Sequence, residues 1–264
     1  MMNISVIGAG YVGLITGIGF AKLNHQVSIV DLNDDLIKNL NENRPPFYEP
    51  ELVDYLNDSN IRNNLFFSTS YQKSINENTD IVFVCVQTPT DPDTGKTKTD
   101  YISSVLTELK KIESFNFIIC IKSTIKATLV EKISNEIDLD YKKIIFNPEF
   151  LREGSAFYDF FNPDRIVIGG SDQKGLNQCT ELYESFDCEK IITDSNSSQM
   201  IKYLSNTYLA MRLSFVNETY RLVSEFNGNP EEVLNAIGKD KRIGNDYFRP
   251  SPGWGGSCFP KDVK

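Results

Sequence analysis

The glycine pattern near the amino terminus constrains the fold more than any other feature of this sequence. Gly8, Gly10 and Gly13 form a G-x-G-x-x-G motif that follows the apolar run ISVIG and opens a helical stretch. A second apolar run, QVSIVD, ends in Asp31, eighteen residues after Gly13. Such a motif alone is weak, but between a strand and a helix, with an acid at the end of the next strand, it predicts a dinucleotide site.

Each of these residues has a physical role in such a site. Gly8 permits a tight turn, Gly10 lets the backbone approach a pyrophosphate, and Gly13 lets helix and strand pack closely. Asp31 can accept hydrogen bonds from the adenosine ribose, and the Leu and Asn that follow it offer no cation for a 2′-phosphate. The pattern therefore favours NAD over NADP. An FAD site, or a strand-turn-helix with packing glycines and a surface aspartate, would share the motif.

Apolar strand-like runs alternate with helical patterns through the first two thirds of the chain. Including those already named, the strand candidates are 4–8, 26–31, 80–86, 115–121, 142–147 and 164–170, and the helical candidates are 11–23, 35–41, 101–112 and 129–137. Strands that are apolar on both faces and interleaved with helices predict a parallel sheet covered on both sides. We therefore expect an α/β fold, with a Rossmann-type doubly wound domain over 1–194.

The pattern changes at residue 195, where a long helix is expected. No Gly or Pro interrupts 195–226, Asp194 or Ser195 can cap its start, and Gly228 is a natural stop. Its apolar side carries Ile201, Leu204, Tyr208, Met211, Phe215, Leu222 and Val223. Helices of this length connect domains or form subunit interfaces. We assign 195–264, with a short helix at 230–237, to a second, helical domain.

Composition excludes several classes of protein. The chain has 264 residues, a net charge of −9, five cysteines and one histidine, His25. The acidic balance argues against nucleic-acid binding, and a single histidine without any Cys-x-x-Cys pair argues against a metal site. Cys85 and Cys120 lie in apolar runs and are expected to be buried, in a reducing compartment. The uncharged stretch 4–21 has no preceding Lys or Arg and contains the glycine motif, so we expect a cytoplasmic protein rather than a membrane span.

The most unusual segment is GWGGSCFPKD, at 253–262. It places Cys258 among small residues that leave its sulfur approachable, and Lys261 can favour the reactive thiolate. A cysteine in a glycine-rich turn is more often incidental than catalytic when it is considered alone.

Three other segments carry polar residues at suggestive spacings. NPEFLREG places Glu149 and Glu153 four residues apart, on one face if the segment is helical. KYLSN places Lys202 and Asn206 on one face of the long helix, and Thr124 ends a strand at the edge where α/β sheets bind ligands. Each has an ordinary alternative: a solvated acidic face, a lysine extended along the surface, and a helix cap.

Together these segments resemble the nucleotide-sugar 6-dehydrogenases of the UDP-glucose/GDP-mannose dehydrogenase family, most closely its UDP-glucose members. The resemblance covers essentially the whole chain, and its motifs are GAGYVG (8–13), VDLN (30–33), CVQTPT (85–90), KST (122–124), NPEFLREGSA (147–156), NPDRIVIG (162–169), KYLSNTYLAMR (202–212) and GWGGSCFPKD (253–262).

The resemblance implies a four-electron oxidation of a sugar C6 alcohol to a carboxylate, with two NAD+ as acceptors. It implies that Cys258 captures the intermediate aldehyde as a thiohemiacetal, which is oxidised to a thioester and hydrolysed by water. Lys202 and Asn206 would stabilise oxyanions at C6, and Asp262 and Thr124 would assist proton movement. Glu153, or Glu149, would act as base or water activator.

The resemblance also implies two sets of contact residues. Those for NAD are Gly8, Gly10, Tyr11, Val12, Gly13, Asp31, Thr88, Thr124, Glu153 and Lys261. Those for UDP-glucose are Glu149, Phe150, Leu151, Arg152, Lys202, Asn206, Arg242, Tyr247, Phe248, Arg249, Pro250, Ser251 and Gly255, with Arg242 reaching substrate across the dimer interface. The resemblance further implies that 195–264 is a middle domain that mediates homodimer formation.

One departure from the family pattern bears on activity. Family members continue beyond the PKD motif into a second Rossmann-like domain that holds the nucleotide, whereas this sequence ends at Lys264. We expect NAD binding with weak or absent turnover from this chain alone. The alternatives are a GDP-mannose 6-dehydrogenase, a non-catalytic NAD-binding or dimerisation fragment, and a redox switch at Cys258. A UDP-N-acetylmannosamine dehydrogenase fits the Lys-Asp pair less well.

Overall fold

The computed structural model describes residues 1–112, 116–253, 255, 262 and 263. The chain forms two compact units, Met1–Met200 and Ile201–Lys264, and each has an apolar core of its own. The predicted domain boundary lies at the start of the long helix. The boundary between the two units falls six residues later in the sequence, within that helix.

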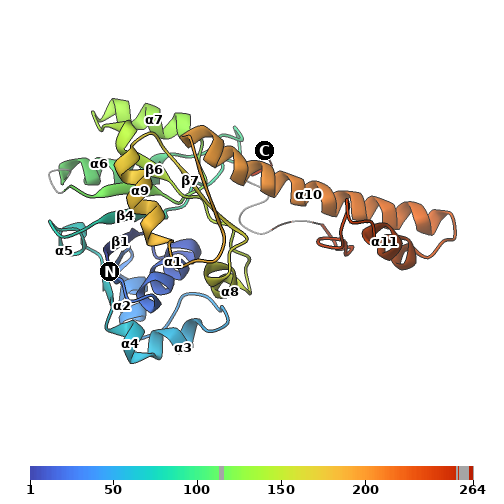
Figure 1. Cartoon of the computed structure of the whole chain (residues 1–264), viewed down its shortest axis with the longest axis horizontal. Helices are drawn as coiled ribbons and strands as arrows, with labels where there is room; N and C mark the ends of the chain where they lie inside the picture. Colours follow the sequence, from blue (N-terminus) through green and yellow to red (C-terminus); the bar gives the residue numbers. More distant parts are fainter. Residues whose placement is uncertain (113–115, 254, 256–261, 264) are drawn as a thin grey trace. The chain divides into compact units, whose positions relative to one another are not determined.

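The first unit is built on an eight-stranded sheet with the strand order β3-β2-β1-β4-β5-β6-β7-β8 (Figure 1). The strands are β1 (Asn3–Ile7), β2 (Gln26–Val30), β3 (Leu65–Ser68), β4 (Ile81–Val84), β5 (Ile118–Ile121), β6 (Ile144–Phe146), β7 (Arg165–Gly169) and β8 (Glu189–Thr193). The order reverses between β1 and β4. In open α/β sheets, ligands bind outside the carboxyl ends of the strands at such a point.

Helices cover both faces of this sheet. They are α1 (Tyr11–Lys22), α2 (Asp34–Asn41), α3 (Leu52–Asn57), α4 (Ser59–Arg62), α5 (Tyr71–Ser74), α6 (Asp100–Lys111), α7 (Ala127–Glu136), α8 (Ala156–Phe161) and α9 (Gln173–Leu182). One core packs α1, α8 and α9 against one face, and a second core packs α6 and α7 against the other. Neighbouring strand residues alternate between these cores, as in Phe83 and Val84, so the central strands are buried on both faces.

The predicted α/β fold is confirmed, but the sheet is not entirely parallel. β1 to β6 run parallel, whereas β7 pairs antiparallel with β6 through Phe146 and Gly169, and β8 follows β7. An apolar run has the same composition in either direction, so the sequence pattern does not report this reversal. The prediction also missed β3 and β8. β3 is only four residues long, and β8 is an edge strand without a fully buried residue.

The second unit contains the long helix α10 (Ser195–Glu225), apart from its first turns, and the short helix α11 (Pro230–Gly238). Asn229 caps α11 by accepting hydrogen bonds from two backbone amides, and Pro230 occupies the first turn, which needs no donor. Val216, Leu234 and Phe248 form the core of this unit. Among the described residues, no helix is long and apolar enough to cross a membrane.

Candidate functional site: a dinucleotide turn and an acidic loop

The three motif glycines occupy different environments at the carboxyl end of β1. Gly8 has φ +99°, and a Cβ there would lie 2.8 Å from the carbonyl oxygen of Cys85. A Cβ on Gly13 would lie 1.9 Å from the carbonyl oxygen of Gly8, so close packing of α1 on β1 requires glycine there. Gly10 is exposed at the start of α1, and no atom lies within 4 Å of its hypothetical Cβ. Open space beside a helix amino terminus is where a pyrophosphate would approach the backbone.

Asp31 lies at the end of β2 beside this turn. Its Oδ2 accepts a hydrogen bond of 2.9 Å from the amide of Ala9, and its Oδ1 accepts one of 3.0 Å from the amide of Asn33. The carboxylate is therefore fixed next to the glycine turn. Each oxygen retains a further lone pair that can accept a ribose hydroxyl.

The loops after β4 and β5 are joined at the same edge of the sheet. The buried Thr88 hydroxyl donates to the carbonyl of Thr124 at 2.8 Å. The Ser123 hydroxyl lies 2.6 Å from the carbonyl of Val86. Thr88 and Thr124, both predicted from the family resemblance to contact NAD, are thus brought together.

The acidic segment NPEFLREG is a loop with turns rather than a helix, and α8 begins only at Ala156. Glu149 and Glu153 therefore do not share a helical face. Glu149 is buried and accepts a hydrogen bond of 2.7 Å from the amide of Leu151, whereas Glu153 is exposed. The two acids differ in environment, a distinction that their spacing in the sequence does not give.

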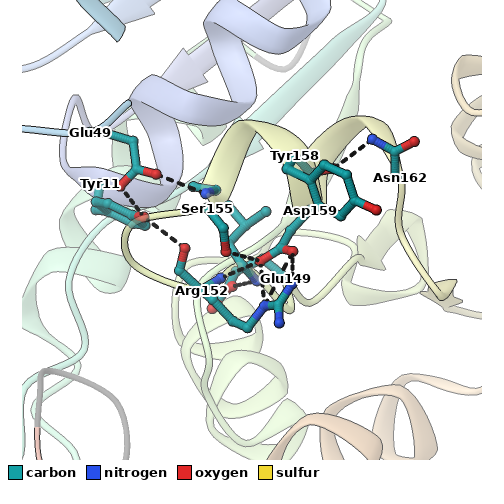
Figure 2. A network of polar contacts seen from close by, with 10 residues as sticks. Tyr11, Glu49, Glu149, Arg152, Ser155, Tyr158, Asp159 and Asn162 are labelled. Carbon is teal, nitrogen blue, oxygen red and sulfur yellow. Dashed lines mark hydrogen bonds and ion pairs between the residues drawn. The ribbon is translucent and has the colours of Figure 1, made fainter. Parts of the chain in front are cut away.

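Arg152 is bound to Asp159 of α8 through several contacts (Figure 2). Its guanidinium lies 2.5 Å from Oδ1, and its own amide donates to Oδ2 at 2.9 Å. Burial alone raises the pKa of Asp159, but the hydrogen bonds and charge of Arg152 outweigh burial and hold that pKa below its ordinary value. Phe150 lies under the guanidinium of Arg165, 3.8 Å from the ring centroid. The loop is thus held to α8 through Arg152 and to β7 through Phe150.

Sequence reasoning missed Glu49, which lies between the glycine turn and the acidic loop (Figure 2). It is 3% exposed, and its carboxylate accepts hydrogen bonds from the Tyr11 hydroxyl and from the amides of Gly154 and Ala156. Burial, with the hydrogen bond and charge of Glu49, raises the pKa of Tyr11 far above its ordinary value. The available signal was an acid between Tyr48 and Pro50, in the proline-rich segment PPFYEPEL.

A buried lysine, Lys122, was also missed as a polar centre although its motif was noted. Its Nζ lies 2.9 Å from Oδ1 of Asn147, and the Tyr183 hydroxyl donates to the same oxygen at 2.6 Å. The Asn147 amide in turn donates to the carbonyl of Val167. This cluster ties the ends of β5 and β6 to the middle of β7, and it includes Asn147, the first residue of the acidic loop. Burial raises the pKa of the neighbouring Cys85 thiol to about 12, with opposing contributions from Lys122 and Glu149, so this cysteine is an inert core residue.

In the second unit, α10 carries the predicted oxyanion-stabilising residues. Lys202 and Asn206 are both buried, and Nδ2 of Asn206 donates to Oδ2 of Asp262 at 2.7 Å. Burial and the charge of Asp262 raise the pKa of Tyr203 to about 12. The structure thus brings Asn206 and Asp262 together from positions 56 residues apart in the sequence.

The predicted substrate residues between 242 and 255 differ in exposure. The Phe248 side chain belongs to the core of the second unit and lies under the Arg212 guanidinium, so only its backbone is available for a ligand. The Ser251 amide donates a hydrogen bond of 3.0 Å to Oδ1 of Asn217. The others are exposed: Arg242, Tyr247, Arg249, Pro250 and Gly255. Arg242 is paired with Asp240, two residues before it.

Cys258 and Lys261 lie outside the described residues. The geometry of the predicted nucleophile is therefore not part of the site described above, and its role remains a prediction from the sequence.

Comparison with known proteins places the chain. The NAD binding domain of the UDP-glucose/GDP-mannose dehydrogenase family matches residues 2–187, and the central domain of that family matches residues 196–264. The chain belongs to this family. NAD is its cofactor, as the glycine motif and Asp31 predicted, and the open space at Gly10 beside the fixed carboxylate of Asp31 fits that molecule.

Individual relatives agree with this assignment. UDP-glucose 6-dehydrogenase YwqF of Bacillus subtilis is 37% identical over 99% of this chain, which spans 60% of that relative. A UDP-glucose dehydrogenase structure from Pyrobaculum islandicum matches 99% of this chain with a TM-score of 0.91 at 36% identity, over 62% of its own length. A GDP-mannose dehydrogenase structure from Pseudomonas aeruginosa matches 99% of this chain with a TM-score of 0.85 at 28% identity, again over 62% of its length. The chain therefore spans about three fifths of the relatives that it matches.

Proposed function

We propose that this chain takes part in the NAD-dependent oxidation of UDP-glucose to UDP-glucuronate. The observation that carries the proposal is the exposed, sterically open Gly10 at the start of α1, with Asp31 fixed beside it and the acidic loop 147–155 at the same edge of the sheet. Similarity to named UDP-glucose 6-dehydrogenases over 99% of the chain supports the choice of sugar nucleotide.

The proposed chemistry proceeds through a sulfur-bound intermediate on Cys258. The C6 alcohol loses a hydride and a proton to become an aldehyde, and the Cys258 thiolate adds to this carbonyl to form a thiohemiacetal. Loss of a second hydride and a proton gives a thioester, which water cleaves to the carboxylate and the free thiol. Bound NAD+ supplies the hydride acceptor for each of the two oxidations, so one UDP-glucose consumes two NAD+.

The second unit supplies the groups that stabilise charge at C6 in this proposal. Lys202 and Asn206 lie one helical turn apart on α10, and donors at i and i+4 share one face. Lys202 would stabilise the alkoxide and the tetrahedral oxyanions, which is the task of a preorganised donor. Asp262, which accepts a hydrogen bond from Asn206, orients that amide and can receive a proton.

The acidic loop supplies the water-activating group. Glu153 is exposed and follows the chain segment that Arg152 and Asp159 hold in place, whereas Glu149 is buried and already accepts the Leu151 amide. We therefore assign general-base activation of the hydrolytic water to Glu153, and loop support to Glu149. Arg152, with its guanidinium on Asp159, contributes to the sugar-diphosphate site through its position in this loop.

Two alternatives have specific support. The similarity to a GDP-mannose dehydrogenase structure keeps that sugar nucleotide as a second candidate substrate. A non-catalytic NAD-binding and dimerisation function would need only the features of the two units described here. We further propose a cytoplasmic location, because the described cysteines are free and three of the four are buried.

The cofactor assignment is tested by calorimetric titration. NAD+ is expected to bind the chain, and NADP+ is expected to bind about tenfold or more weakly, because a 2′-phosphate would meet the Asp31 carboxylate. Replacing Asp31 by Asn should bring the affinities for NAD+ and NADP+ closer together while leaving the fold intact. Equal affinities for both cofactors in the unaltered chain would contradict the role given to Asp31.

The reaction is tested by following the absorbance of reduced cofactor with UDP-glucose, and separately with GDP-mannose. Two NADH for each UDP-glucose indicates the full reaction, whereas NAD+ binding without any NADH from either sugar nucleotide supports the non-catalytic alternative. Cys258→Ala should abolish the second oxidation, and Cys258→Ser should stall with a slowly hydrolysed ester. Normal turnover by Cys258→Ala would exclude the covalent route.

A further inference from the structure

Glu49 is a buried carboxylate that contacts both parts of the proposed cofactor site. It lies in the segment between α2 and α3 and is 3% exposed. Its Oε2 accepts hydrogen bonds from the Tyr11 hydroxyl at 2.8 Å and from the Gly154 amide at 2.9 Å, and its Oε1 accepts one from the Ala156 amide at 2.8 Å. One side chain therefore joins three donors that lie 38, 105 and 107 residues away along the chain.

The first of these contacts reaches the glycine turn. Tyr11 is the first residue of α1 and directly follows Gly10, whose open side is where the cofactor approaches. The Tyr11 hydroxyl also lies 3.1 Å from the carbonyl of Arg152, and its ring packs against Phe47 at 5.1 Å. The hydroxyl has one proton to donate. We assign this proton to Glu49, because that contact is the shorter of the two.

The second contact reaches the acidic loop. The Gly154 amide belongs to the peptide group that Glu153 begins, so a hydrogen bond to this amide fixes the plane of that peptide. Gly154 has φ +89°, a conformation that other residues rarely adopt, and Glu49 therefore holds the loop in a specific turn. Glu153 is also close enough for its charge to raise the pKa of Tyr11.

We propose that Glu49 is a positioning residue that fastens the start of α1 to the loop bearing Glu153, and so holds the two walls of the NAD site at a fixed separation. The inference rests on the proposed NAD site and deepens it, because it names the group that makes the glycine turn and the acidic loop one structural unit (Figure 2). A carboxylate suits this position because it is acceptor-only and can meet three donors, whereas a glutamine would oppose one of them with its own N–H.

A simpler role would be support of α8 alone. The Ala156 amide is an otherwise unpaired donor in the first turn of that helix, and the Ser155 side chain makes no capping hydrogen bond. A residue that only capped α8 would not depend on the Tyr11 hydroxyl. If Glu49 positions the NAD site, the effects of Glu49 and Tyr11 substitutions on NAD+ affinity should depend on each other. If Glu49 only supports α8, the two effects should be independent.

The test is a double-mutant cycle on NAD+ affinity, measured by calorimetry with the whole chain. Glu49→Gln is expected to weaken NAD+ binding about tenfold, and Tyr11→Phe about threefold. The double variant should bind no more than about twofold more weakly than Glu49→Gln alone, because the Tyr11 hydroxyl acts through the carboxylate that Glu49→Gln has already replaced. A double variant whose loss equals the product of the two single losses would overturn the proposal, as would NAD+ affinity within twofold of the unaltered chain for Glu49→Gln.

Glu51→Gln serves as a matched control, and Tyr11→Phe serves as a second test if Glu49→Gln does not fold. Glu51→Gln makes the same chemical change two residues away on an exposed side chain, and it should leave NAD+ affinity within about twofold of the unaltered chain. If Glu49→Gln does not fold, as judged by circular dichroism, Tyr11→Phe decides alone: an affinity equal to that of the unaltered chain overturns the proposal. Failure of the unaltered chain to bind NAD+ would instead contradict the proposed function, which this titration measures first.

Discussion

At the scale of single residues, the one histidine of the chain gives a pH dependence that can be assigned to one side chain. Nδ1 of His25 accepts a hydrogen bond of 3.1 Å from the amide of Met2, and its ring lies edge-on to Phe20. Burial, and then the positive amino terminus, lower the pKa of His25 below its ordinary value. Protonation would place a donor against the Met2 amide, so the folded state favours the neutral ring.

The direction of the resulting effect on stability follows from linkage. Between the folded pKa and about 6.5 the unfolded state binds more protons, so the free energy of unfolding rises with pH in that window. The stabilisation is complete above about 6.5 and is lost as the pH falls through the folded pKa. We expect urea unfolding of the unaltered chain to show this slope as the pH falls below about 6.5, and His25→Asn to show a smaller one. Equal slopes would show that other groups titrate there.

The sequence indicated the local geometry of a residue where that residue type has few physical uses. A motif glycine next to a strand and an acid at the next strand end predicted the positions that the structure gives to Gly10 and Asp31. The sequence did not indicate the geometry of Glu49 or Lys122, because a buried charge needs partners from distant segments, and those partners are defined only by the tertiary fold. The same reason separates Glu149 from Glu153, which the spacing had placed together.

At the scale of elements, most helices with long periodic patterns were predicted to within two residues, as for α6 and α10, whereas the ten-residue α9 was missed. Their patterns extend over several turns and so average out local exceptions. The short helices α3, α4 and α5 have four to six residues and were not predicted, because their formation depends on packing against the sheet. The direction of β7 was equally undetermined, since it depends on the end of the sheet at which the connection from β6 re-enters.

The first turn of α1 allows packing and ligand binding to be separated by two substitutions. Gly13→Ala forces a methyl group to within 1.9 Å of a backbone oxygen, and overpacking of this kind costs at least about 1–3 kcal/mol. Gly10→Ala meets no atom within 4 Å, and the extended backbone there suits alanine, so stability should change by less than about 1 kcal/mol.

NAD+ affinity should respond most strongly to Gly10→Ala, the substitution that changes stability least. The Gly10 methyl group would occupy the space that the pyrophosphate needs, and we expect Gly10→Ala to weaken NAD+ binding about tenfold or more. Thermal unfolding and calorimetric titration of the two variants together check both expectations. A Gly10→Ala variant with the affinity of the unaltered chain would show that the cofactor does not approach at this point.

At the scale of the whole molecule, α10 exposes a stripe of large apolar side chains. The stripe consists of Leu204, Tyr208, Met211, Phe215 and Leu222, each between 47% and 58% exposed. Their spacing of three, four and seven residues places them on one face of the helix. Contiguous exposed apolar surface of this kind marks an interaction site. The family resemblance predicts a dimerisation element in this helix, and we therefore propose that the stripe packs against the same stripe of a second copy.

This homodimer is tested by sedimentation velocity over a range of protein concentrations. A two-fold symmetric interface contains each substitution twice, so Met211→Glu should place two like charges in an apolar contact and shift the chain towards monomer. Ser214→Glu adds the same charge at an exposed position on the neighbouring face of the helix and should leave the dimer in place. Monomer in the unaltered chain at every concentration would contradict the proposal. Equal dissociation by both variants would show that net charge, rather than the stripe, controls association, because only the stripe position is buried when two copies pair.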